Sequence, residues 1–198
     1  GDAAHAEALL GASKAARRRF LVTESVFSMD GDIAPLRELA RACQRTGSRI
    51  IVDEAHAVGV VGPGGRGLCA ELGLAGEASP TCRVVTCGKA MGASGGALVG
   101  SRDLVDLLIH RGRGFVFSTA VAPAIVGALD ASIELVDAAS DARRTLRRHA
   151  AAVAAASRTN SASALGLAGP AAAIVPLVVG AAGSAVEAQE RLAEQGLD

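Results

Sequence analysis

Residues 50–59 read IIVDEAHAVG, a short apolar run followed at once by acidic residues, a histidine and a glycine. The run at 49–53 predicts a buried strand, and similar runs occur at 20–26, 83–86 and 96–100. Helical spacing is found between and around these runs, at 3–17, 34–46 and 102–110. Apolar strands that alternate with helices are typical of a mostly parallel sheet flanked by helices, so we predict an α/β fold.

The C-terminal part of the chain has a different pattern. We expect an alanine-rich helical stretch at about 121–157, a strand at 173–179 and an amphipathic helix at 183–195. This pattern indicates the start of a second α+β unit. We therefore divide the chain into part of a large domain, residues 1–134, and the start of a small C-terminal domain, residues 135–198.

The composition argues against several kinds of partner and site. The net charge is zero and only 2% of residues are aromatic, so neither a polyanion-binding face nor a base-stacking surface is indicated. The four cysteines form no CxxC pair and have no histidine at zinc spacing. No apolar run reaches the ~20 residues of a membrane span, and no signal peptide opens the sequence. We expect a cytoplasmic protein that binds no nucleic acid, membrane or metal.

The letters D-E-A-H at 53–56 also occur at the nucleotide site of one class of helicases. Such proteins need a GxxxxGK[ST] phosphate loop upstream. The only Gly-Lys pair lies downstream, and its window at 83–90 lacks both the first glycine and the final Ser or Thr. The GPGGRG run at 62–67 fits GxGxxG, but no acidic residue follows at the distance that a ribose contact needs. The sequence therefore favours a glycine-rich turn over a nucleotide site.

Lys89 is one of only two lysines among 20 basic residues, and the other, Lys14, lies in a basic run of surface type. A lysine can lose its proton and attack a carbonyl carbon, which an arginine cannot do. Burial among the small neighbours of Lys89 would favour the neutral amine and make it a nucleophile for Schiff-base formation. Taken alone, Lys89 could equally be a surface lysine.

Four polar residues near predicted strand ends strengthen the catalytic interpretation. Ligands of open α/β sheets bind beyond these ends, and a lysine Schiff base with an aspartate on the ring nitrogen is the partnership found in pyridoxal phosphate sites. Asp53 can supply that aspartate, and His56 can donate to the phenolic oxygen of the ring. Thr86 offers a hydroxyl to a phosphate, and Ser28 follows another strand. Singly these residues could be ordinary caps; together with Lys89 they indicate one site.

Three runs carry a resemblance to a known family: VTESVFSMDGDIAPL at 22–36, IIVDEAHAVGVVGPGGRG at 50–67 and TCGKAMGASGGALVGS at 86–101. They resemble the α-oxoamine synthases, which belong to the fold type I enzymes that depend on pyridoxal 5'-phosphate (PLP). The similarity covers nearly the whole chain. It implies the PLP-dependent transferase fold, with residues 1–134 as part of its large domain.

The resemblance implies a role for each candidate residue. Lys89 matches the lysine that forms the Schiff base with PLP and moves protons at the substrate Cα. Asp53 matches the aspartate that keeps the ring nitrogen protonated. His56 matches a catalytic histidine that contacts the phenolic oxygen, and Ser28 matches a second residue at that oxygen.

The resemblance also implies phosphate contacts and a homodimer. Thr86 matches a residue that binds the phosphate. Ser118 and Thr119, in the run FVFSTA, match a pair that reaches the phosphate from the other subunit.

Within the family, the motifs resemble most the acyltransferase of biotin biosynthesis. Its reaction joins L-alanine to a pimeloyl thioester, carried by CoA or by an acyl carrier protein, with loss of carbon dioxide. Alternatives within the family pair glycine with acetyl-CoA, glycine with succinyl-CoA, or serine with palmitoyl-CoA. A non-catalytic subunit of the same fold is a further alternative, against which the retained Lys89 argues.

Family members are longer than this chain. The upstream turn that cups the phosphate, the histidine that stacks on the ring and the downstream arginine that binds the substrate carboxylate have no counterpart here. His5, His110 and His149 do not occupy the stacking position. We therefore expect the chain to be an internal fragment of the enzyme, and residues 1–198 alone to be inactive.

Overall fold

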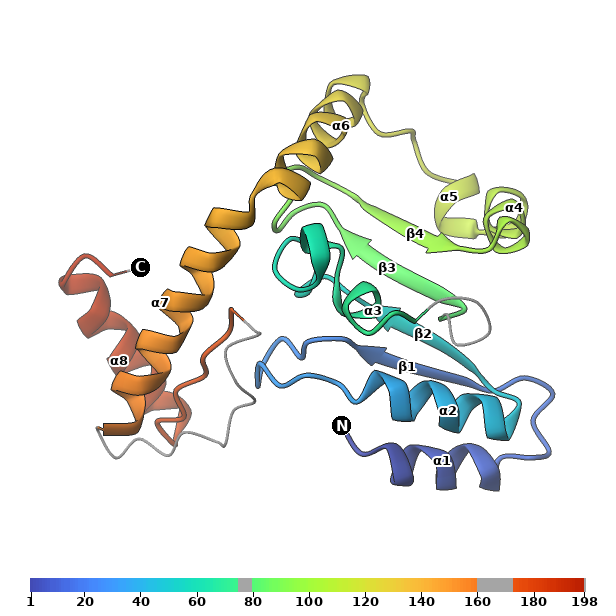
Figure 1. Ribbon diagram of the computed structural model, residues 1–198, viewed down its shortest axis with the longest axis horizontal. Coiled ribbons are helices and arrows are strands. Elements are labelled where there is room, and N and C mark those ends of the chain that lie inside the picture. Colours follow the sequence, from blue (N-terminus) through green and yellow to red (C-terminus); the bar gives the residue numbers. More distant parts are fainter. Residues whose placement is uncertain (75–79, 160–172, 198) are drawn as a thin grey trace.

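The computed structural model of the protein describes residues 1–74, 80–159 and 173–197. Within these residues one four-stranded sheet forms, with helices around it (Figure 1). The strands are β1 (Phe20–Glu24), β2 (Arg49–Asp53), β3 (Cys82–Thr86) and β4 (Gly96–Gly100). The helices are α1 (Ala3–Ala12), α2 (Leu36–Thr46), the 3-10 turn η1 (Pro63–Gly65), α3 (Leu68–Glu71), α4 (Arg102–Arg111), α5 (Arg113–Val116), α6 (Pro123–Ala138), α7 (Ser140–Thr159) and α8 (Ala182–Glu194).

The sheet has the order β1-β2-β3-β4. The first three strands run parallel, with Glu24 opposite Asp53 and Asp53 opposite Val84, and β4 runs antiparallel to β3. The prediction of a mostly parallel α/β sheet is therefore confirmed. Because β1, β2 and β3 point the same way, their carboxyl ends share one edge of the sheet, where ligands of such folds bind.

The core lies between this sheet and the helices α1 and α2, which Figure 1 shows on one side of it. Apolar residues recur along α2 at helical spacing, and Leu36, Leu39 and Cys43 are buried. The helix ends at Gly47, whose φ of 63° is the left-handed conformation that glycine adopts without a steric cost. This packing fixes β1 and β2, and with them the first half of the sheet edge.

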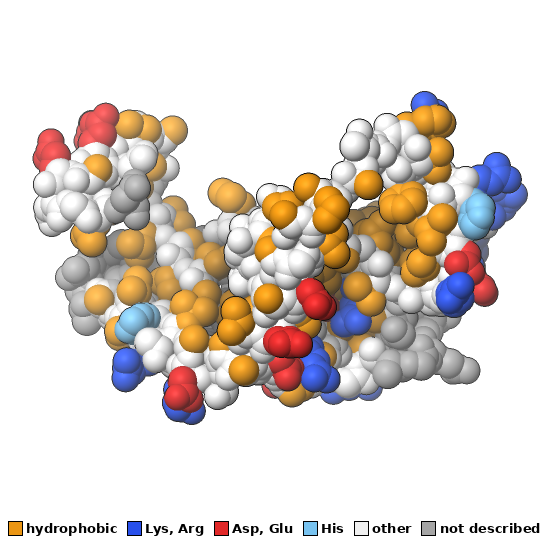
Figure 2. Space-filling model, turned by 90° about the horizontal axis from the view of Figure 1, so that it is seen from above, with side chains coloured by type: hydrophobic (Ala, Val, Ile, Leu, Met, Phe, Trp, Pro, Cys, Tyr) orange, Lys and Arg blue, Asp and Glu red, His pale blue; other side chains and the backbone are white. Residues whose placement is uncertain are grey.

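From β4 onward the structure is more open. The helices α4, α5, α6 and α8 contain no buried residue, and every residue of β4 is exposed. Figure 2 shows hydrophobic side chains gathered on the face that these elements present. The described residues contain no helix that is both long and apolar enough to cross a bilayer.

Several predicted elements differ from the structure. The first helix ends at residue 12 instead of 17, and the stretch at 121–157 is split at Ala139 into α6 and α7. The predicted strand at 173–179 is wrong, because no described strand pairs with these residues and a lone strand leaves its backbone groups unpaired. The predicted domain boundary after residue 134 falls inside α6 and stays a prediction.

Candidate active site

The predicted cofactor residues follow adjacent strands at the carboxyl edge of the sheet. Asp53 is the last residue of β2 and Thr86 the last residue of β3. His56 lies three residues beyond β2, and Lys89 three residues beyond β3. Ser28 follows β1, which is the neighbour of β2 on its other side. The strand order thus brings together residues that are far apart in the sequence.

Lys89 and His56 are in direct contact. The Nζ atom of Lys89 lies 2.5 Å from the Nε2 atom of His56, which is within hydrogen-bond distance. The side chain of Lys89 is exposed, contrary to the expected burial, because the turn at 88–95 projects beyond β3 and most of its residues are open to solvent. The contact with His56 therefore orients an accessible amine.

Asp53 divides its carboxylate between the backbone and the site. The Oδ1 atom accepts a hydrogen bond of 2.8 Å from the backbone N–H of Ala55, which fixes the turn after β2. The Oδ2 atom makes no hydrogen bond within the described residues. Because the carboxylate is fixed by one oxygen, its other oxygen can accept a hydrogen bond from a protonated ring nitrogen.

Thr86 carries a buried hydroxyl without a hydrogen-bond partner in the described residues. Buried polar groups in folded proteins are nearly always paired, so a hydroxyl left unpaired needs a physical reason. A phosphate oxygen at the end of β3 would supply the missing partner.

Glu24 holds the loop that carries Ser28, a contact that sequence reasoning missed. The Oε2 atom of Glu24 accepts from the backbone N–H of Ser28 at 3.0 Å, and Oε1 accepts from its hydroxyl at 3.4 Å. The available signal was the spacing, since Glu24 ends β1 four residues before Ser28. Ser28 is exposed and sits beside the same sheet edge as Asp53.

Ser118 and Thr119 follow α5 and not one of the strands that carry the other five predicted residues. Both are exposed and follow α5, and the hydroxyl of Ser118 donates to the backbone oxygen of Gly114 at 2.6 Å. Within the described residues, neither forms a hydrogen bond with the other predicted site residues. Their predicted phosphate role stays a prediction.

Glu54, the second letter of the DEAH run, proves to be a structural residue. Its side chain is fully buried, accepts from the backbone N–H of Cys69 at 2.9 Å, and pairs with Arg83 at 3.4 Å. Burial raises the pKa of the Cys69 thiol to about 12, and the negative charge of Glu54 acts in the same direction. Glu54 thus connects α3, through Cys69, to β3, through Arg83.

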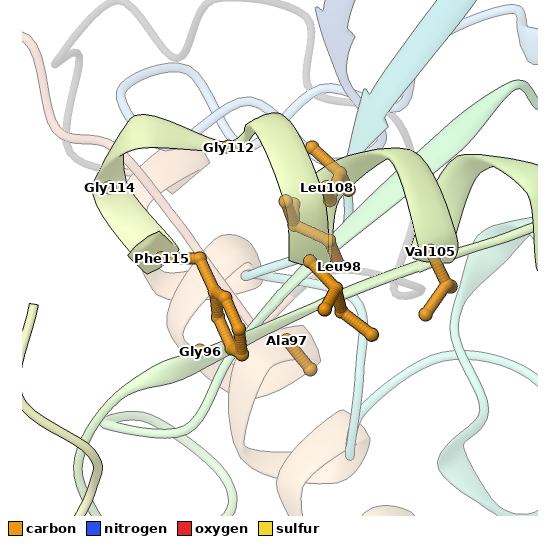
Figure 3. Close-up of a pocket in the computed structure, with 9 residues that line it drawn as sticks. Gly96, Ala97, Leu98, Val105, Leu108, Gly112, Gly114 and Phe115 are labelled. Carbon is orange, nitrogen blue, oxygen red and sulfur yellow. The ribbon is translucent and has the colours of Figure 1, made fainter. Parts of the chain in front are cut away.

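Two pockets flank β4 and the lysine-bearing turn. The larger, of about 530 Å³, lies between β4 and the helices α4 and α5, and only glycine and apolar side chains line it, among them Leu98, Leu108 and Phe115 (Figure 3). The smaller, of about 410 Å³, lies between the glycine-rich loop and α6 and is lined in part by Met91. Neither pocket is lined by a predicted cofactor residue.

This geometry agrees with comparisons to known proteins. A family model described as aminotransferase class I and II matches residues 1–197. The chain belongs to this family. Members of the family depend on PLP.

The chain is similar to curated members of the family that the motifs had indicated. The 8-amino-7-oxononanoate synthase of Methylococcus capsulatus is 42% identical over 195 residues, which are 98% of this chain and 49% of that protein. The enzyme of the same name from Anaeromyxobacter dehalogenans (strain 2CP-1) is 45% identical over 183 residues, or 91% of this chain and 44% of that protein. The resemblance drawn from the motifs is confirmed. The chain spans about half the length of the curated relatives it matches.

Solved structures from the family confirm the predicted fold. The serine palmitoyltransferase of Sphingomonas wittichii superposes with a TM-score of 0.90 at 31% identity, covering 99% of this chain and 48% of that one. An 8-amino-7-oxononanoate synthase from Francisella tularensis superposes with a TM-score of 0.74 at 25% identity, covering 91% of this chain and 52% of that one.

The residues present fit the cofactor of the family. An accessible amine at Lys89, a free carboxylate oxygen on Asp53 and an unpaired hydroxyl on Thr86 lie at the ends of two adjacent parallel strands. These are the three groups that a PLP molecule needs for its aldehyde, its ring nitrogen and its phosphate.

Proposed function

We propose that this chain carries the PLP-binding core of an acyltransferase that joins L-alanine to a pimeloyl thioester, of CoA or of an acyl carrier protein. The product is 8-amino-7-oxononanoate, an intermediate of biotin biosynthesis. The motifs at 50–67 and 86–101 and the identity to the curated synthases support this choice of substrates.

The contact between Lys89 and His56 carries the proposal. It places a directed amine 2.5 Å from an imidazole at the sheet edge that also holds Asp53. When bound, PLP supplies the electron sink for a substrate carbanion. Lys89 Nζ accepts the proton from the substrate Cα, while His56 orients that amine through Nε2 and contacts the phenolic oxygen. Asp53 Oδ2 keeps a proton on the ring nitrogen.

The remaining predicted residues hold the cofactor in place. The hydroxyl of Thr86 donates to the phosphate, and Ser28 contacts the phenolic oxygen from the β1 side. Ser118 and Thr119 reach the phosphate of the second subunit in a homodimer, which their exposure supports. The four free thiols support a reducing compartment, and we place the protein in the cytoplasm.

Serine palmitoyltransferase activity is the second candidate function. The solved structures that superpose at a TM-score of 0.90 carry that name, and they cover nearly the whole chain. The higher identity to the curated 8-amino-7-oxononanoate synthases favours alanine and a pimeloyl thioester over serine and palmitoyl-CoA.

The proposal is tested on the gene product that carries residues 1–198, in two stages. First, the purified protein is mixed with PLP and reduced with borohydride, and we expect a yellow band to vanish as the label appears on Lys89 in peptide mass spectrometry. Lys89→Arg keeps the positive charge but cannot form a Schiff base, so this matched variant gives no band. A label on Lys14, or none, overturns the cofactor assignment.

Second, turnover is compared with four substrate pairs: L-alanine with pimeloyl-CoA, L-serine with palmitoyl-CoA, and glycine with acetyl-CoA or succinyl-CoA. We expect the first pair to give the largest kcat/KM, with carbon dioxide and free CoA released in equal amounts. A larger kcat/KM for the serine pair would replace the proposed substrates by those of the second candidate.

A further inference from the structure

Gly59 and Ala90 meet where the two segments of the site touch each other. Gly59 lies three residues beyond His56, and Ala90 directly follows Lys89. The backbone at each position therefore sets where one partner of the Lys89–His56 contact lies.

Gly59 leaves no room for a side chain on the side of Ala90. Its φ is 83°, and a Cβ atom built on it would overlap the Cβ atom of Ala90, closer than real Cβ atoms approach other atoms. The Cα atom of Ala90 would lie 3.7 Å from that Cβ, which is ordinary van der Waals contact. The methyl group of Ala90 thus occupies the space that the glycine leaves open.

Gly59 also has no room to retreat. Its backbone N–H donates to the oxygen of Gly65 at 2.7 Å, and a Cβ on Gly65 would lie 3.0 Å from the Cα of Gly59. Behind Gly65 lies the guanidinium of Arg143, which is buried and donates to the backbone oxygens of Val136 and Asp137 in α6. A side chain at position 59 would therefore displace Ala90, because Ala90 is exposed and can move into solvent.

A side chain of α6 holds the turn that carries Lys89. The hydroxyl of Ser132 donates to the backbone oxygen of Met91 at 2.7 Å, and Gly92 N–H closes the turn on the oxygen of Lys89 at 3.0 Å. A push on Ala90 is transmitted to Lys89 through this closed turn.

We propose that Gly59 is a positioning residue for Lys89: its bare Cα receives the methyl group of Ala90, and this fit sets the Nζ atom of Lys89 against Nε2 of His56. The inference rests on the proposed function in taking Lys89 as the nucleophile. It predicts that the exchange of the two side chains, Gly59→Ala with Ala90→Gly, restores the fit that Gly59→Ala alone destroys.

The matched control is Gly92→Ala. Gly92 lies in the same turn with a φ of 60°, and a Cβ there meets nothing within 4 Å. It carries the strain of a left-handed backbone without the overlap. The five proteins to compare are therefore Gly59→Ala, the double variant, Gly92→Ala, the parent, and His56→Ala as the reference for a broken contact.

The first measurement needs no cofactor. Trace acetylation of the gene product, followed by peptide mass spectrometry, gives the labelling ratio of Lys89 to Lys14 across a pH series. We expect the pH profile of Gly59→Ala to match that of His56→Ala, and the double variant and Gly92→Ala to follow the parent. An unchanged profile in Gly59→Ala, or a Gly92→Ala profile like that of Gly59→Ala, overturns the proposal.

The second measurement is the Kd for PLP with the fraction of Lys89 labelled after borohydride. Because misplacing a reacting group by about 1 Å costs up to ~100-fold, we expect Gly59→Ala to raise the Kd by at least about tenfold. The double variant should recover to the level of Gly92→Ala. If Gly59→Ala does not fold, thermal unfolding decides: failure of Ala90→Gly to restore folding overturns the fit.

The two proposals fail differently. If the parent protein shows no yellow band and no label on Lys89, the proposed function is overturned. The acetylation profiles still test the contact between Gly59 and Ala90. A normal band in the parent and an equal one in Gly59→Ala, with equal Kd values, overturns only the positioning role.

Discussion

Two regions of this molecule differ in how far they bury their apolar side chains. The first, residues 1–87, contains every buried apolar residue among those described, whereas the second, from β4 onward, leaves large apolar side chains exposed. The helices α2 and α6 show the contrast. Five of the 11 residues of α2 are buried, but none of the 16 residues of α6 is. An apolar helix face has a partner only where the chain brings a second surface to it, so the first region supplies its own core.

The largest expected effect compares a leucine from each region. Leu36 in α2 is 1% exposed and Leu135 in α6 is 71% exposed. We expect Leu36→Ala to lower the free energy of unfolding by about 3 kcal/mol, because it leaves a cavity, and Leu135→Ala to change it by less than about 0.5 kcal/mol. Urea unfolding monitored by circular dichroism measures both. A loss at Leu135 close to that at Leu36 would show that α6 is covered in solution and would break the comparison.

The second prediction compares two ion pairs. Glu54 is fully buried against Arg83, whereas Asp137 pairs with Arg66 at 3.2 Å on the surface. Glu54→Ala leaves the partly buried guanidinium of Arg83 and the buried N–H of Cys69 without their partner, so we expect a loss of about 3 kcal/mol in unfolding free energy. Asp137→Ala should cost about 0.5 kcal/mol.

A matched variant separates the charge of Glu54 from its hydrogen bond. Glu54→Gln keeps an acceptor for the backbone N–H of Cys69 and removes only the charge, so its loss should be intermediate. If the three variants unfold at the same urea concentration, the buried pair contributes nothing to the first region.

The third prediction compares two glycines with nearly the same backbone angle. Gly67 has a φ of 94° and Gly95 a φ of 91°, but a Cβ on Gly67 would lie 2.6 Å from the Glu54 carboxylate, while one on Gly95 meets nothing within 4 Å. We expect Gly95→Ala to cost about 1 kcal/mol from backbone strain alone and Gly67→Ala about 2 kcal/mol or more. Thermal unfolding resolves the difference, and equal shifts would refute the close packing beneath the site.

The smallest expected effect is the contribution of Cys69 to the pH dependence of stability, which tests how deeply the first region buries its side chains. Its folded pKa is raised to about 12 from the ordinary 9.0. The unfolded thiol therefore ionises first, and the stabilisation that is present below pH 9 is lost as pH rises toward 12. Between pH 8 and pH 9.5, this ionisation of Cys69 lowers the free energy of unfolding by about 1 kcal/mol. We expect Cys69→Ala to flatten the stability-against-pH curve by this amount, and an unchanged slope would contradict the raised pKa.

Much of the fold was predictable from local pattern. The bounds of β2 and β4 match the predicted ones, and α2 lies within two residues of its predicted start, because apolar spacing and Gly47 mark these elements directly. The strand at 173–179 failed for a different reason. Its apolar residues favour a strand, but a strand forms only where a second strand pairs with it, and the sequence does not show whether one is present.

The site was predictable in part for the same reason. Lys89 was identifiable as an unusual residue type after a strand, and Asp53 by its place at a strand end. The roles of Glu54 and Gly59 were not visible, because both depend on atoms from distant segments: Arg83 and Cys69 for the one, Ala90 for the other.

The sequence by itself determined the alternation of strands and helices, the choice of lysine over arginine at position 89, and the polar residues placed after the strands. Periodicity and residue chemistry are properties of short segments, so they are readable without coordinates. Only the tertiary structure decided that β2 and β3 lie side by side, that His56 thereby contacts Lys89, and that Glu54 turns inward. Those outcomes depend on distances between segments, which close packing sets.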